Sequence, residues 1–289
     1  MRAFGLNIKS DIELNLPKDE GLIDVYIEKR DFDLPKCFKT KITRYDTIAY
    51  FAEKDEFYYL SWPNLANFKI SKNQILYQPL SDLPDGLLRI FILSEAFGLL
   101  LLKRDYFLLH GSAVAFENHA EIFIGTPGAG KSTTIAAFAK NGFQILTDDL
   151  VAITFNNKGE PFVVPSFNEI KVWKDALLGL NWDYENVQPA WEGKEKYLFK
   201  TENWSSKNLP LKRISILKKP YSKYKKPLSP IHLPIEFIKY FPLAHQALEG
   251  NVTKKHFEQS LRIIEHVEVR ILNRPKNFIE LEKFVNTYQ

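Results

Sequence analysis

The chain of 289 residues has a single cysteine, Cys37, and a single methionine. One thiol excludes a disulfide framework and a metal site built from several thiolates. The sequence also lacks a strong excess of one charge, because 39 Lys and Arg face 35 Asp and Glu. A net charge of +4 is too small to indicate the clustered basic face of a nucleic-acid-binding protein. We therefore expect no nucleic-acid partner.

Long, purely apolar runs are missing as well. The longest apolar stretch, residues 87–102, is interrupted by Arg89, Ser94 and Glu95, which argues against a membrane span. Residues 1–16 have neither the apolar core nor the small-residue cleavage site of a secretory signal. With 45% hydrophobic and 26% charged residues, the composition is typical of a globular protein. We expect a cytoplasmic protein that does not associate with membranes.

Two regions differ in their hydrophobic pattern. The first is predicted to be rich in strands, which we place at 3–8, 12–16, 21–28, 46–52, 56–62, 67–70 and 74–78. Turn-forming residues at 81–86 precede an apolar helix that runs to about residue 103. We therefore predict a small N-terminal β-rich domain at 1–85 and a second domain at 86–289, whose first part, 86–104, is a helical connector.

The second region alternates strands with helices. Short strands are expected at 106–110 and 114–116, and a buried strand at 121–124 leads into a glycine-rich loop. A helix at 131–140 ends at Asn141-Gly142, and a strand follows at 143–147. Further along we expect strands at 213–217 and 267–272 and a terminal helix at 277–287. This order predicts an α/β fold with a βαβ-like unit around the loop.

The glycine-rich loop carries the strongest functional signal. It matches the pattern G-x-x-x-x-G-K-[ST] in full, with the residues Gly125, Thr126, Pro127, Gly128, Ala129, Gly130, Lys131 and Ser132. The glycines let successive backbone N–H groups point at one phosphate, and the positive end of the following helix adds to the attraction. In such a loop Lys131 reaches the β- and γ-phosphates, Ser132 is a magnesium ligand, and Thr133 is placed for another phosphate oxygen. The sequence thus predicts a P-loop that binds a nucleotide with Mg²⁺.

A pair of carboxylates, Asp148 and Asp149, follows the strand at 143–147. Because sites in such sheets lie at the carboxyl ends of strands, we expect the pair beside the loop. One carboxylate can hold the hydrated magnesium, and a kinase needs a second one to accept a hydroxyl proton. Asp148 comes only 17 residues after Lys131, so we expect the two strands to be neighbours in the sheet. This short spacing favours a compact P-loop protein over a switch GTPase or a motor.

Several stretches resemble one known family. Residues 109–114, 124–133 and 142–149 are similar to the catalytic core of the HPr kinase/phosphorylase family. Residues 165–173 and, more weakly, 4–11 resemble its branch in bacterial peptide-modification gene clusters. Some members of that branch phosphorylate a serine of a ribosomal precursor peptide, including lasso-peptide precursors. The specific similarity covers 108–173, under a quarter of the chain, and implies a P-loop kinase core with the mixed sheet of the HPr kinase C-terminal domain.

The resemblance also implies roles for single residues. Asp149 aligns with the family's catalytic carboxylate, which takes the proton from the substrate serine. Asp148 and Ser132 align with groups around magnesium, and Glu169 matches a glutamate of the second family signature that also serves the metal. His110 aligns with an active-site histidine, although a lone histidine there would otherwise be interpreted as a core or turn residue. The similarity to a family with hexameric members leaves a homo-oligomer open.

The sequence departs from the family at two points. Lys171 stands where the second signature has arginine, and a lysine cannot form a bidentate fork. No clear counterpart of the family's arginine loop for phosphorolysis is present, so phosphorylase activity and HPr as a substrate are both in doubt. Lys194 and Lys196 are candidates for a phosphate-facing cation, against the simpler interpretation of surface lysines. The basic segment 212–226 is interpreted as a solvated loop, with a docking surface for an acidic peptide or for nucleic acid as the alternatives.

Together these patterns predict an ATP- and Mg²⁺-dependent serine kinase. Lys131, Asp149 and His110 are its expected catalytic residues. The expected acceptor is a serine of a peptide or protein, with a lasso-type precursor peptide as one candidate. Two alternatives stay open: a kinase for a small molecule such as free serine, and a non-catalytic regulator that binds ATP as a switch.

Overall fold

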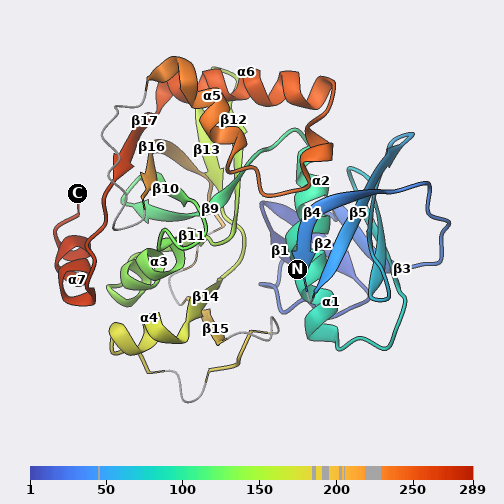
Figure 1. The fold of residues 1–289 in the computed structure, drawn as a ribbon, viewed down its shortest axis with the longest axis horizontal. Coiled ribbons are helices and arrows are strands. Elements are labelled where there is room, and N and C mark those ends of the chain that lie inside the picture. Colours follow the sequence, from blue (N-terminus) through green and yellow to red (C-terminus); the bar gives the residue numbers. More distant parts are fainter. Residues whose placement is uncertain are drawn as a thin grey trace. The chain divides into compact units, whose positions relative to one another are not determined.

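The computed structural model describes residues 1–44, 46–183, 187–190, 195–201, 204, 206–218 and 229–288. The chain has a mixed α/β fold, and it divides into two compact units (Figure 1). Unit 1 comprises Met1–Leu108 and Pro242–His256, and unit 2 contains the glycine loop, the Asp pair and the C-terminal residues. Whether residues 1–85 form a domain by themselves stays a prediction.

Unit 1 is built on one eight-stranded sheet. Its strands, in spatial order, are β1 (Arg2–Ala3), β2 (Leu6–Ser10), β3 (Val25–Lys29), β8 (Gln74–Pro79), β7 (Ala66–Ile70), β6 (Phe57–Trp62), β5 (Thr47–Lys54) and β4 (Phe38–Arg44). The meander from β4 to β8 is antiparallel, whereas β3 pairs in parallel with both β2 and β8. The sheet is therefore mixed.

Unit 1 differs from the sequence prediction in several details, and its strand β4 was not predicted. The strand expected at 3–8 is split, because Phe4 and Gly5 adopt left-handed backbone with φ of 49° and 72° and form a turn between β1 and β2. Residues 12–16 are not a strand, although Ile12, Leu14 and Leu16 alternate into the core as a strand would. The expected helix is present as α1 (Asp85–Phe91), a π-helical turn η1 (Ile92–Ala96) and α2 (Phe97–Lys103).

Unit 2 contains a seven-stranded sheet and a two-stranded ribbon. The sheet strands are β9 (Phe107–Phe116), β10 (His119–Gly125), β11 (Ile145–Thr147), β12 (Leu150–Phe155), β13 (Pro161–Val164), β16 (Leu209–Leu217) and β17 (Glu268–Leu272). The ribbon strands are β14 (Glu169–Trp173) and β15 (Lys196–Lys200). The helices of the second half of the chain are α3 (Lys131–Lys140), α4 (Lys174–Gly179), α5 (Leu233–Ile238), α6 (Asn251–His266) and α7 (Phe278–Asn286), with short 3-10 turns η2 (Pro230–His232) and η3 (His245–Leu248).

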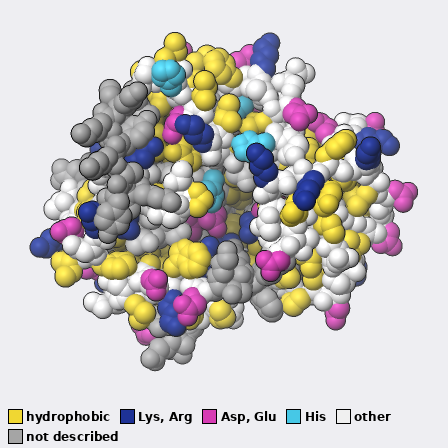
Figure 2. Space-filling model, viewed as in Figure 1, with side chains coloured by type: hydrophobic (Ala, Val, Ile, Leu, Met, Phe, Trp, Pro, Cys, Tyr) yellow, Lys and Arg dark blue, Asp and Glu magenta, His cyan; other side chains and the backbone are white. Residues whose placement is uncertain are grey.

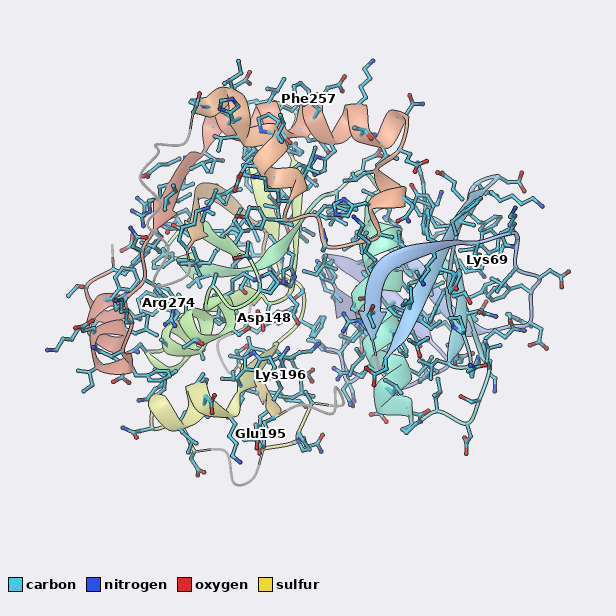
Figure 3. The ribbon with its side chains drawn as sticks, viewed as in Figure 1. Lys69, Asp148, Glu195, Lys196, Phe257 and Arg274 are labelled. Atoms are coloured by element: carbon cyan, nitrogen blue, oxygen red, sulfur yellow. The ribbon has the colours of Figure 1, made fainter. Side chains whose placement is uncertain are left out.

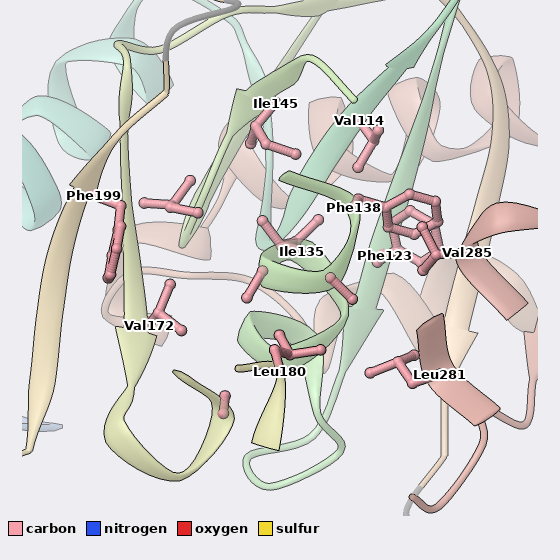
Figure 4. Close-up of a cluster of buried hydrophobic side chains, with 14 of the residues drawn as sticks. Val114, Phe123, Ile135, Phe138, Ile145, Val172, Leu180, Phe199, Leu281 and Val285 are labelled. Carbon is pink, nitrogen blue, oxygen red and sulfur yellow. The ribbon is translucent and has the colours of Figure 1, made fainter. Parts of the chain in front are cut away.

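The helix α3, predicted at 131–140, is confirmed, and a buried cluster of apolar side chains fixes its position (Figure 4). Ile135 and Phe138 of α3 lie in this cluster with Phe123 of β10. The other sides of the cluster come from the ribbon, α4 and α7, through residues such as Val172 and Leu281. Each large side chain buried in this way contributes about 1.5–3 kcal/mol. The packing therefore holds the first turn of α3 at the end of the sheet.

No helix in the described part of the chain combines the length and the apolar character needed to cross a membrane. Among the described side chains visible in Figure 2, those of Lys and Arg are scattered among acidic ones.

Candidate active site

The glycine loop connects the end of β10 to the start of α3. Gly128 and Gly130 have left-handed backbone, with φ of 78° and 95°, and Gly130 is the residue that precedes the helix. An L-residue would be strained in both conformations. The Lys131 Nζ atom donates a hydrogen bond of 2.8 Å to the carbonyl oxygen of Gly125, so this side chain folds back over the loop. Residues 126–128 are exposed, whereas Ala129 is fully buried.

Three parallel strands end at the level of this loop. Gly125 of β10 lies opposite Leu217 of β16, which in turn lies opposite Leu272 of β17. A Cβ atom on Gly125 would lie 2.9 Å from the Leu217 carbonyl oxygen, so the close approach of β10 and β16 requires glycine here. The loop thus lies at the carboxyl ends of β10, β16 and β17, which is where such sheets carry their sites.

The strand before the Asp pair is not a neighbour of β10, and here the sequence prediction is wrong. Strand β9 lies between them and pairs antiparallel with β10 on one side and with β11 on the other. The expected breaks around Gly111 are absent, and residues 107–116 form one continuous strand. In a simple βαβ unit β11 would pair directly with β10. Here β9 takes that position beside β10, because a tight hairpin joins these two strands.

Asp148 is held by two hydrogen bonds. The Ser112 hydroxyl of β9 donates to its Oδ1 atom at 2.7 Å, and the backbone N–H of Lys171 donates to its Oδ2 atom at 3.1 Å. Burial, followed by the negative charge of Asp149, raises the pKa of Asp148 to about 6, and the two hydrogen bonds oppose this shift. Each carboxylate oxygen can accept a second bond, so Asp148 keeps the capacity to bind a metal or its water.

Asp149 has a different environment. Its backbone is left-handed, with φ of 65°, and its side chain is 40% exposed. The Nδ1 atom of His110 lies 3.0 Å from the Asp149 carbonyl oxygen, and because a carbonyl can only accept, Nδ1 must carry the proton. The Nζ atom of Lys171 lies 3.5 Å from the Asp149 carboxylate. Asp149 is therefore held by its backbone while its carboxylate stays accessible.

Four titratable side chains, His110, Lys131, Lys171 and Lys196, surround these carboxylates. Burial lowers the pKa of His110, and the positive charges of Lys131 and Lys196 add to this effect, whereas Asp149 opposes it. Burial also lowers the pKa of Lys131, and both carboxylates oppose that shift. Lys196 comes from β15, and its charge acts on both His110 and Lys131. The fold thus brings His110 of β9, Lys131 of α3 and the Asp pair together with lysines of the ribbon.

Two predicted metal ligands lie at the edges of this group. Ser132 is in the first turn of α3, and Glu169 begins β14 on the same strand face as Lys171. Among the described residues, no three His, Cys, Asp and Glu side chains converge as a metal-binding group. Mg²⁺ in nucleotide sites is bound by one or two carboxylates together with phosphates and water. The Asp pair and Ser132 supply oxygen donors of that type.

Other predicted elements contribute less or fall outside the described chain. Lys194 and most of the basic segment 212–226, from residue 219 onward, lie outside the described residues. Arg213, in the same segment, pairs with Glu121 at 2.6 Å and with Glu268 at 2.8 Å, so it joins strands of the sheet.

Sequence reasoning assigned no role to Ser112 or Arg274. Ser112 lies two residues after His110, so both side chains are on one face of β9. A prediction of one unbroken strand at 107–116 would have placed Ser112 beside His110. Arg274 follows β17 by two residues and packs against Gly130, as described below. Its position at the carboxyl end of a strand was the available signal.

No protein-family model matches the chain, and no curated protein matches its sequence. Among solved structures, the chain is similar to the HPr(Ser) kinase/phosphatase from Coxiella burnetii, with 14% identity and a TM-score of 0.29. The match covers 43% of this chain and 73% of that one. At this level of similarity, function has to be inferred from the geometry of the site itself.

Proposed function

We propose that the chain is a P-loop kinase that uses ATP and Mg²⁺ to phosphorylate a serine hydroxyl of a peptide or protein. The observation that carries this proposal is the difference between the two adjacent carboxylates. Asp148 is fixed by Ser112 and the Lys171 amide, whereas the Asp149 carboxylate is open to solvent beside the glycine loop. A metal site alone needs one such carboxylate, and an accessible second one suits proton transfer from an acceptor.

The residues divide the reaction as follows. Backbone amides of residues 128–132 and the Lys131 ammonium hold the phosphates. Asp149 accepts the proton of the serine hydroxyl while the serine oxygen forms a bond to the γ-phosphorus. The bond between the γ-phosphorus and the β-γ bridging oxygen breaks at the same time, and ADP is released. Asp148, with Ser132 and Glu169 as further candidates, would hold Mg²⁺, which neutralises charge on the phosphates when bound. Positioning and electrostatics then supply most of the rate.

His110 and Lys171 support the base in this scheme. His110 fixes the carbonyl of Asp149 by the hydrogen bond from Nδ1, and Lys171 lies within ion-pair distance of the carboxylate. The cation of Lys171 favours the ionised carboxylate, which is the form that can accept a proton. Lysine in place of the family's arginine thus preserves a positive charge at this position.

The test is a phosphotransfer assay read by mass spectrometry. The wild-type chain, Asp149→Asn and the exposed control Asp33→Asn are incubated with ATP, Mg²⁺ and three acceptors: free serine, HPr and a serine-containing precursor peptide. We expect the peptide to gain one HPO₃ unit with the wild type and the control. Asp149→Asn should bind ATP normally and transfer about 10²–10⁴-fold more slowly.

Each other outcome changes the conclusion. Transfer only to free serine would make the chain a small-molecule kinase. Tight ATP binding without transfer to any acceptor would favour the regulator. Transfer by Asp149→Asn at the wild-type rate would show that Asp149 is not the base.

A further inference from the structure

Arg274 lies against the glycine loop from the side of β17. A Cβ atom placed on Gly130 would be 2.3 Å from the Arg274 Nε atom and 2.8 Å from its Cζ atom, so the guanidinium covers the Cα of Gly130. Pro275 follows directly and restricts Arg274 to extended backbone. In Figure 3 Arg274 is on the β17 side of α3, and Asp148 lies on the opposite side. The arginine is thus a second cation at the loop, separate from Lys131.

One donor of the Arg274 guanidinium has no acceptor in the described part of the chain. Its Nε atom is inaccessible to solvent and has no hydrogen-bond partner among the described residues. Burial lowers the pKa of Arg274. The side chain also lies at the start of α3, where the exposed N–H groups of the helix carry a partial positive charge. A buried N–H donor of a cation without an acceptor, at the positive end of a helix, is unfavourable unless an anion joins it.

We propose that Arg274 is a nucleotide-binding residue whose guanidinium contacts the phosphate chain of the nucleotide held in the glycine loop. This inference rests on the proposed function, because it requires that the loop binds a nucleotide. The planar guanidinium offers parallel N–H donors that match two phosphate oxygens, and one phosphate would satisfy Arg274 and the helix start together. Gly130 is needed for this arrangement, because any side chain there would displace the arginine.

The phosphate chain is a better partner than the nucleotide base. A base would stack on the guanidinium but would leave its charge uncompensated next to Lys131 and the helix start. A phosphate carries the opposite charge and accepts hydrogen bonds from both groups. Contact with phosphate therefore predicts that Arg274 also strengthens the binding of a ligand that has no base.

The experiment compares two ligands by isothermal titration calorimetry with Mg²⁺ present: ADP and inorganic tripolyphosphate. The variants are Arg274→Gln, Arg274→Lys and Arg30→Gln, the last as an exposed control in unit 1. Losing a charge-assisted hydrogen bond should weaken binding about tenfold or more, so we expect this loss for both ligands in Arg274→Gln. Arg274→Lys should be intermediate, because it keeps the charge without the fork. Arg30→Gln should bind like the wild type.

The ligand pair separates the outcomes. Weaker binding of ADP with unchanged binding of tripolyphosphate would overturn the proposal and assign Arg274 to the base. Unchanged binding of both ligands, with phosphotransfer intact, would overturn the role of Arg274 and leave the kinase proposal standing. A wild-type chain that binds neither ligand would refute the proposed function itself. Far-ultraviolet circular dichroism of each variant checks folding, and if Arg274→Gln does not fold, the Arg274→Lys titration decides.

Discussion

At the residue scale, one histidine outside the candidate site has a strongly perturbed environment. His256 is 3% exposed and stacks on Phe107, with 4.4 Å between the ring centroids. Burial lowers the pKa of His256 from 6.5 to about 4, because the apolar surroundings disfavour the protonated ring. The folded chain therefore holds this imidazole neutral at a pH where the unfolded chain would protonate it.

This depressed pKa predicts a loss of stability on mild acidification. Between pH 6.5 and 4 the unfolded state binds more protons at His256 than the folded state, so the free energy of unfolding falls as the pH falls. Across this range the loss attributable to His256 amounts to about 3 kcal/mol. Urea denaturation at pH 7, 5.5 and 4.5 measures it, and His256→Phe should flatten the slope. An equal slope in wild type and variant would contradict the prediction.

At the element scale, most strands and helices with clear periodicity were predictable, with residues 12–16 as an exception, whereas the pairing of the strands was not. The helix 131–140 and the loop before it follow from local signals: a full G-x-x-x-x-G-K-[ST] pattern and the Asn141-Gly142 ending. The position of β9 between β10 and β11 does not, because strand pairing is decided by packing far along the chain. Strand β4 was missed for a different reason: its residues are mostly exposed at the edge of the sheet, so they show no clear alternation of buried and exposed side chains.

The residues of the candidate site also fall into two groups, those predicted from the sequence and those found only in the structure. The pattern alone singled out Lys131 and the Asp pair as candidates, because phosphate and metal binding restrict which residue types can stand there. Ser112 lies in β9 and Arg274 just after β17, and only the folded sheet brings these two segments to the loop. Their side chains are ordinary in sequence, and only their contacts distinguish them.

The contact between α4 and α7 gives a prediction for these elements. A Cβ atom on Gly179, the last residue of α4, would lie 2.1 Å from the ring of Phe278 at the start of α7. Gly179→Ala therefore forces the ring to move and should destabilise the fold by about 1–3 kcal/mol, as overpacking generally does. Urea denaturation of the variant measures this difference.

A second substitution isolates the clash. In the background Phe278→Ala the ring is gone, so adding Gly179→Ala should cost much less than it does in the wild type. A double-mutant cycle gives the coupling directly. The same cost in both backgrounds would show that the effect arises from the backbone of α4 instead of the ring.

At the scale of the whole molecule, unit 1 is completed by a distant part of the chain. Gln246 donates a hydrogen bond of 2.9 Å to the carbonyl oxygen of Lys39, and Lys255 pairs with Asp105 at 2.5 Å. Leu243 packs closely against Gly98 of α2 and is only 5% exposed. Residues 242–256 are thus part of the core of unit 1, although nearly half of the chain lies between them and α2.

This arrangement predicts how fragments of unit 1 behave. A fragment 1–108 exposes the surface that Leu243 and its neighbours cover, so we expect it to unfold at lower urea concentration than the same fragment joined to residues 242–256 by a flexible linker. Buried leucine side chains contribute about 2–5 kcal/mol each when their removal leaves a cavity, which sets the size of the difference. Equal denaturation midpoints would show that residues 1–108 are stable without that segment.

The central position of β9 has a consequence for motion. Its amides are hydrogen-bonded within a strand that has a partner on each side, and its apolar side chains are almost all buried. Such strands open only when a whole domain unfolds, whereas exposed loops open freely. In hydrogen exchange the residues beneath the candidate site should therefore be among the last to exchange, and the exposed turn at 126–128 among the first. A ligand bound at the candidate site would therefore contact a rigid strand, β9, on one side and a mobile turn, 126–128, on the other.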